Sequence, residues 1–175
     1  MEELVLSAKA GSKEDFVKLI ELNKQSMYKV ARSFLQNEED VADVLQESIL
    51  KCYSSLAKLR EEQYFKTWLI RIVINECKNI ISKNKDETVV DEIPDTGVAE
   101  GGYGEFEFRE LLDSLDAKYS IVLLLYYGEG YNAREIARIL GLNEVTVRSR
   151  LSRGRKKFLQ LSMEDGKGVF YYGRG

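Results

Sequence analysis

The residues of this chain best suited to binding another molecule are arginines and lysines crowded into one short segment. Six of the ten residues from 148 to 157 are basic, and residues 131–158 hold eight Arg and Lys against only Glu135 and Glu144. Basic groups at this density neutralise phosphates, and arginine can also donate two parallel hydrogen bonds to the O6 and N7 atoms of guanine. The segment therefore favours binding to nucleic acid.

Side chains that most enzymes and metal sites need are scarce. The chain has no histidine, and its two cysteines, Cys52 and Cys77, are 25 residues apart. They form neither a CxxC redox pair nor a zinc-binding set, and each lies in an apolar helical pattern that predicts a reduced, buried thiol. Phosphate-binding glycine motifs are missing as well. We expect no enzyme activity, cofactor, metal site or small-molecule substrate.

Helical periodicity dominates the elements that must position the basic groups. Apolar residues recur at helical spacing over residues 13–35, 39–56 and 64–82, and helical patterns resume near residue 105. The apolar run at 121–127 is interpreted as a buried helix because helical patterns flank it. Residues 86–116 carry eleven acids against a single basic residue.

This pattern predicts an all-α protein with two small helical domains joined by an acidic flexible linker. The predicted segments are a first domain at 1–85, a linker at 86–104, a second domain at 105–162 and a disordered tail at 163–175. The N-terminal residues lack the features of a secretory signal, and no apolar run is long enough to span a bilayer. We therefore expect a cytoplasmic protein that does not insert into a membrane.

The basic segment lies in the second helix of a predicted helix-turn-helix. Gly141 falls where the preceding helix needs a C-terminal residue with positive φ, and Asn143 fits as the N-cap of the next helix. At about 100° per residue, Val147, Leu151 and Gly154 share one face and are expected to pack on the preceding helix. The opposite face is small and polar, with arginines at its edges, and we expect it to enter the major groove of DNA.

Both halves of the chain together resemble a known family, the extracytoplasmic-function (ECF) group of bacterial sigma-70 family RNA polymerase sigma factors. In the second half the resemblance lies in LDSL (112–115), VLLLYYGEG (122–130) and TVRSRL (146–151), and in the first half in DVADVLQES (40–48) and FKTWLIRI (65–72). It covers roughly residues 5–160. The sequence departs from the family at Asp116, where a proline is frequent, and near Ser120, where an arginine is frequent.

The resemblance implies that the second domain binds the −35 element of promoters. Arg148, Ser149, Ser152 and Arg153 would meet the bases, and Thr146 would also contact DNA. The remaining cations are expected to neutralise phosphates, which positions a domain without reading sequence; they are Arg150, Arg155, Lys156 and Lys157.

For the first domain, the resemblance implies capture of the melted −10 element. Unpaired bases are held by stacking on aromatic rings and by a basic groove, and a pocket for a flipped base is implied at residues 58–63. The expected DNA-contacting residues are Tyr64, Phe65, Lys66, Trp68, Arg71, Asn75 and Lys78. Trp68 could equally belong to the core, because an aromatic residue at helical spacing is commonly buried.

Core RNA polymerase and an anti-sigma factor are the protein partners that the resemblance implies. Asp40, Asp43, Gln46 and Glu47, three and four residues apart on one helix, would face the polymerase clamp, and the second domain would dock on the flap of the β subunit. Two alternatives stay open: a stand-alone helix-turn-helix regulator that binds duplex DNA without polymerase, and an interaction protein that sequesters a partner.

Overall fold

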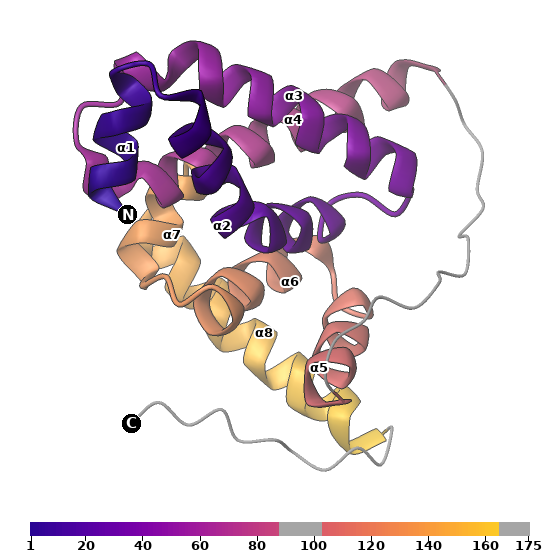
Figure 1. Ribbon diagram of the computed structural model, residues 1–175. Helices are drawn as coiled ribbons and strands as arrows, with labels where there is room; N and C mark the ends of the chain where they lie inside the picture. Colours follow the sequence, from indigo (N-terminus) through magenta and orange to yellow (C-terminus); the bar gives the residue numbers. More distant parts are fainter. Residues whose placement is uncertain (88–102, 165–175) are drawn as a thin grey trace. The chain divides into compact units, whose positions relative to one another are not determined.

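The computed structural model describes the backbone of residues 1–87 and 103–164 and the side chains of residues 1–83 and 108–163 (Figure 1). Every regular element within these ranges is helical, so the predicted all-α class is confirmed. The chain divides into two compact units, Met1–Ile93 and Pro94–Gly175. Most of the expected linker, 86–104, and nearly all of the expected tail, 163–175, lie outside the described residues.

Within residues 1–87, the described part of the first unit, there are four α-helices. They are α1 (Glu2–Lys9), α2 (Lys13–Arg32), α3 (Glu38–Ser55) and α4 (Phe65–Glu87), with 3₁₀ turns η1 (Leu56–Lys58) and η2 (Glu62–Tyr64) between α3 and α4. Side-chain caps define two of the helix starts: Ser12 Oγ accepts from the backbone N–H of Asp15 at 3.2 Å, and Asn37 Oδ1 accepts from that of Glu39 at 2.7 Å. Helix α1 is not predicted from the sequence, although its residues Val5 and Ala8 have the three-residue spacing of a buried helix face.

The core of the first unit draws on all four helices. Val5, Leu19, Val41 and Leu69, one from each helix, are fully buried, and α3 and α4 pack against each other (Figure 1). Cys52 and Cys77 are both buried and unpaired, and burial raises the pKa of each thiol to about 12. They therefore behave as small apolar side chains, as the sequence predicts.

In the second unit, residues 103–164 are described and form four further α-helices and one π-helical turn. They are α5 (Tyr103–Asp113), α6 (Ala117–Leu123), the π turn η3 (Leu124–Gly128), α7 (Ala133–Leu140) and α8 (Glu144–Glu164). The run at 121–127 is helical as predicted, and its residues 121–125 are buried. Its last turn adopts the wider π geometry.

One packing prediction for the second unit is wrong. Val147 and Leu151 are buried as expected, but Gly154 faces α6 rather than α7: a Cβ atom placed on it would lie 3.3 Å from Cδ1 of Leu123 and 3.3 Å from Cβ of Tyr119. The reason is that α8 is long enough to pack on both α7 and α6, and at Gly154 its neighbours are Tyr119 and Leu123 of α6. Among all helices described, none is both long and apolar enough to cross a membrane.

Candidate nucleic-acid interface

A tight turn between α7 and α8 sets the geometry of the basic helix. Gly141 has φ 67°, the left-handed conformation that ends a helix, and the next residue donates its backbone N–H to Ala137 O at 2.9 Å. Asn143 Oδ1 then accepts from the backbone N–H of Thr146 at 2.7 Å and starts α8. Both ends of the predicted turn are confirmed, and each is fixed by contacts within a few residues of it.

The face of α8 opposite the buried Val147 and Leu151 is open to solvent. The structure exposes most of the residues predicted to contact DNA and leaves two partly covered, Thr146 and Arg150. The exposed ones are Arg148, Ser149, Ser152, Arg153, Arg155, Lys156 and Lys157. An exposed helix face with hydroxyls between guanidinium groups fits a major groove, where arginine and serine can both reach base edges.

Two of these cations already have acidic partners. Glu144 Oε1 accepts from Nε of Arg148 at 3.0 Å and from Nη2 at 2.6 Å, and these bonds hold the pKa of the Glu144 carboxyl below its ordinary value. Lys157 lies 3.5 Å from Oδ2 of Asp116 and 5.3 Å from the centre of the Tyr119 ring. Glu144 is not among the predicted site residues, although an acid four residues before an arginine on one helix is a recognisable signal.

In the first unit, α4 and the turn before it present a second set of candidate DNA contacts. Tyr64 is 44% exposed, Trp68 is half-buried, and Arg71, Asn75 and Lys78 are exposed. Because they are spaced by alternating steps of four and three residues, they lie along one side of the helix. Trp68 therefore sits at the boundary between core and surface, with its ring 6.2 Å from that of Phe65.

Phe65 does not fit the role predicted for it. Its side chain is fully buried beneath Trp68, among the largest of the core, so its ring offers no face for an unpaired base. Lys66, next along α4, is half-buried. Phe65 is predicted to stack on a base because it lies at the edge of the loop at 58–63, although its apolar spacing also fits the inner face of the helix. The first turn of α4 points it inward.

The loop at 58–63, where a flipped base would be held, is anchored from α1. Lys9 donates to the backbone carbonyl of Leu59 at 2.9 Å and to Oε1 of Glu62 at 2.6 Å. The Lys9 ammonium holds the pKa of Glu62 below its ordinary value. The unpredicted helix α1 thus fixes both ends of this loop.

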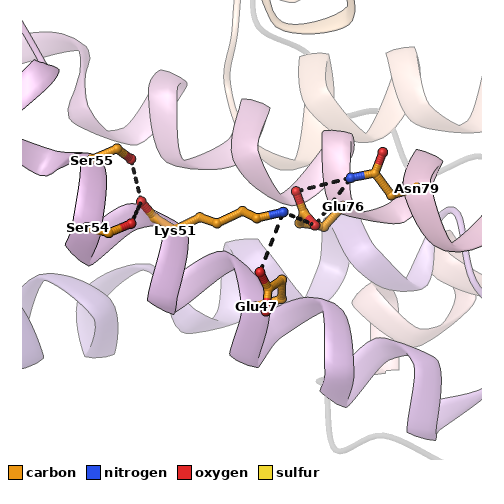
Figure 2. A network of polar contacts seen from close by, with 6 residues as sticks. All are labelled: Glu47, Lys51, Ser54, Ser55, Glu76 and Asn79. Carbon is orange, nitrogen blue, oxygen red and sulfur yellow. Dashed lines mark hydrogen bonds and ion pairs between the residues drawn. The ribbon is translucent and has the colours of Figure 1, made fainter.

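The acidic face predicted for α3 is present, and a polar network ties it to α4. Asp43, Gln46 and Glu47 are exposed, and Asp40 is half-buried. Figure 2 shows Lys51 between Glu47, 3.5 Å away, and Glu76 of α4, 2.7 Å away. Asn79 donates to both oxygens of the same Glu76 at 3.4 Å.

Glu76 is only 8% exposed, so its charge depends on these partners. The position of Glu76 is not predicted from the sequence, because no local pattern identifies an acid on the inner side of a helix. Within the side chains that the structure describes, no three His, Cys, Asp or Glu residues converge in a way that could hold a metal ion.

Both units of the chain match models of a known protein family. The family model for sigma-70 region 2 matches residues 19–87, and that for sigma-70 region 4 matches residues 105–158. The chain is 32% identical over 164 residues to RNA polymerase sigma factor SigV of Bacillus subtilis, covering 91% of this chain and 99% of SigV. ECF RNA polymerase sigma factor SigW of the same organism is 25% identical over 174 residues, with 89% and 93% covered.

Two solved structures share the fold. The sigma factor RpoE, in a co-crystal structure with the anti-sigma factor NepR from Bartonella quintana, matches with a TM-score of 0.72 at 22% identity, covering 87% of this chain and 99% of RpoE. CnrH, in complex with the cytosolic domain of CnrY, matches with a TM-score of 0.70 at 24% identity, covering 94% and 97%. This chain belongs to the sigma-70 family of RNA polymerase sigma factors, in its extracytoplasmic-function group.

Proposed function

We propose that this chain binds core RNA polymerase and directs it to promoters, reading the −35 element with α8 and capturing the melted −10 strand beside α4. The observation that carries the proposal is that each of the two units has a surface suited to a different form of DNA. One is a helix with arginines and serines exposed, suited to duplex DNA. The other combines a half-buried indole, an exposed phenol and cations, suited to unpaired bases.

Within the second unit, base reading falls to the centre of the outer face of α8. Arg148 and Arg153 supply donors for guanine, and Ser149 and Ser152 lie between them at the same surface. Thr146 begins this face. The flanking cations Arg150, Arg155, Lys156 and Lys157 neutralise phosphates and fix the register of the helix in the groove.

Within the first unit, the aromatic contacts fall to Tyr64 and Trp68, since Phe65 is enclosed. Arg71, Asn75 and Lys78 continue the same side of α4 and provide charge and hydrogen bonds along the displaced strand. Lys66 borders this surface. The loop at 58–63, held in place by Lys9, forms the wall of the pocket for a flipped base.

The protein partners follow from the same family membership. Asp40, Asp43, Gln46 and Glu47 of α3 face the polymerase clamp, and the second unit docks on the flap of the β subunit. An anti-sigma factor holds the chain inactive in the cytoplasm, a partner supported by the complexes in which RpoE and CnrH were solved. The chain supplies contacts to DNA and polymerase and no catalytic group of its own.

The domain boundaries that go with this function are those expected from the sequence. Residues 1–85 bind polymerase and the −10 element, residues 105–162 bind the −35 element, and the acidic linker at 86–104 joins them. The two family matches, 19–87 and 105–158, support this division. The tail at 163–175 has no assigned role.

Run-off transcription with purified core polymerase tests the proposal. Reactions with and without the chain, on a library of promoter fragments, should give chain-dependent start sites that share two spaced sequence elements. A variant with Arg148 and Arg153 both changed to alanine should lose these starts, whereas alanine at Lys18, an exposed lysine of α2 outside every predicted contact, should retain them. Absence of new starts, together with duplex binding by the chain alone, would favour the stand-alone regulator.

A further inference from the structure

Glu144 is an acid at the N-terminal end of a strongly basic helix. It begins α8, and the nineteen residues that follow it, 145–163, contain no other Asp or Glu. An acid that faces DNA repels phosphates and weakens binding to every duplex. Glu144 therefore lowers the affinity of α8 for DNA, and this cost points to a second role for its carboxylate.

The contacts of Glu144 indicate that role. Its Oε1 receives hydrogen bonds from Nε and Nη2 of Arg148, at 3.0 and 2.6 Å, and its Oε2 lies 3.8 Å from Nε of Arg134 on α7. Nε and Nη2 form the inner edge of a guanidinium group. The outer edge, made by Nη1 and the second hydrogen of Nη2, remains available, and its two parallel donors match O6 and N7 of guanine.

We propose that Glu144 is a positioning residue for base recognition, which holds Arg148 by its inner edge and presents the outer edge to a guanine of the −35 element. The inference rests on the proposed function and deepens it by naming how one base is read. The Arg148 side chain is 68% exposed, so DNA can reach it, and Arg134 restrains the carboxylate from the other helix.

The physical gain is preorganisation. A free arginine side chain samples many rotamers and loses that freedom when it binds a base, whereas a restrained one loses less. Removing Glu144 should therefore weaken the preference for guanine at one position. The same change deletes a negative charge and should strengthen binding to any duplex. A residue needed only for folding would not move these two quantities in opposite directions.

The test uses holoenzyme assembled from core polymerase and the full chain, on a promoter obtained from the run-off library. Each base of its −35 element is varied, and two quantities are measured: the transcription ratio between matched and substituted promoters, and the affinity of holoenzyme for an unrelated duplex. The variants are E144A, E144Q, R148A and the double variant E144A/R148A. D116N is the matched control, because it removes the acidic partner of Lys157, a proposed phosphate contact, with the same change in charge.

R148A is expected to lower guanine preference at one position by roughly tenfold. E144A should lower the preference at that same position by about threefold to tenfold and E144Q by less, since an amide oxygen can still accept from Arg148. In the R148A background, E144A should cause no further loss of preference. E144A, E144Q and D116N, which each remove one negative charge, should bind the unrelated duplex more tightly. D116N should keep full base preference.

Several results would overturn the inference alone. Full base preference in E144A, as in D116N, would overturn it, and so would a fall in output from all promoters alike. Loss of preference at a different base, or further loss in the R148A background, would mean a direct contact between Glu144 and DNA. Absence of any chain-dependent start with the unaltered chain would overturn the proposed function and this inference with it.

Discussion

Gly154 lies where α8 passes α6, and a side chain there would meet the core of the DNA-binding unit. A Cβ atom at this position would stand 3.3 Å from both Leu123 Cδ1 and Tyr119 Cβ. Leu123 is 2% exposed and Tyr119 is 7% exposed, so neither can swing aside into solvent. Gly154→Val places a branched side chain in this contact and should force the two helices apart.

Two effects of the substitution oppose each other. Valine is the better helix former by a few tenths of a kcal/mol, which favours the variant. Overpacking a closed core costs about 1–3 kcal/mol, which is larger. The net expected loss is about 2 kcal/mol in the free energy of unfolding of the second unit. For a domain of this size, each kcal/mol lowers the melting temperature by about 4–8 °C, so a fall of roughly 8–16 °C is expected.

The single tryptophan makes the effect measurable in the full chain. Trp68 lies on α4 of the first unit, so its emission reports that unit, while far-UV circular dichroism reports helices of both. Gly154→Val should produce an early transition in circular dichroism and leave the tryptophan transition in place. Ser152→Val, on the exposed face of the same helix, is the control and should change stability by less than about 0.5 kcal/mol. If Gly154→Val melts like Ser152→Val, the close approach of α6 and α8 is refuted.

Three further predictions concern contacts described above. Arg148→Ala should cost about 1–3 kcal/mol in the free energy of binding to the −35 element and relax the preference at one base. Lys157→Ala should weaken binding to all duplexes alike and reduce the slope of log binding constant against log salt concentration by about one unit. Equal behaviour of the two variants in salt-dependent binding assays would contradict the assignment of the reading face. Lys51→Met should destabilise the first unit by about 1 kcal/mol, because the nearly buried Glu76 loses its partner at 2.7 Å. The loss is no larger because the Lys51 side chain is 44% exposed, so solvent already weakens the ion pair. Urea unfolding followed by tryptophan emission should show the lower stability, and an unchanged midpoint would refute the prediction. Ser7 of α1 donates a hydrogen bond to Oδ2 of Asp15 at 2.5 Å, and this bond is the largest cause that lowers the pKa of Asp15 to about 2. The stabilisation from Asp15 is therefore complete above its ordinary pKa and is lost as the pH falls from 3.8 towards 2. Asp15→Asn should flatten acid unfolding in this window, and an equal slope would count against the contact.

Where local chemistry decides the structure, the sequence was sufficient. Gly141 and Asn143 act within a few residues of themselves, through a left-handed backbone and a side-chain cap, and both behave as predicted. The outer face of α8 follows from the same turn, because the burial of Val147 and Leu151 fixes which side remains exposed. The region most directly concerned with reading duplex DNA was therefore the most predictable.

Where several helices compete for one face, the sequence was not sufficient. Periodicity shows that Phe65 and Gly154 lie on apolar sides, but the partner of each depends on how far neighbouring helices extend. Glu76 illustrates the same limit, since its pairing with Lys51 joins residues 25 positions apart on two helices. Such contacts are set by tertiary packing, which no local pattern encodes.

The anchoring of the loop at 58–63 has a consequence for engineering promoter preference. Lys9 binds one end of the loop through the backbone carbonyl of Leu59, a group that every residue type supplies, and the other end through Glu62. Neither contact involves the residues between them, Arg60 and Glu61. If the proposed pocket for a flipped base lies at this loop, a library that varies only these two positions would change the side chains offered to the base while both attachment points stay in place.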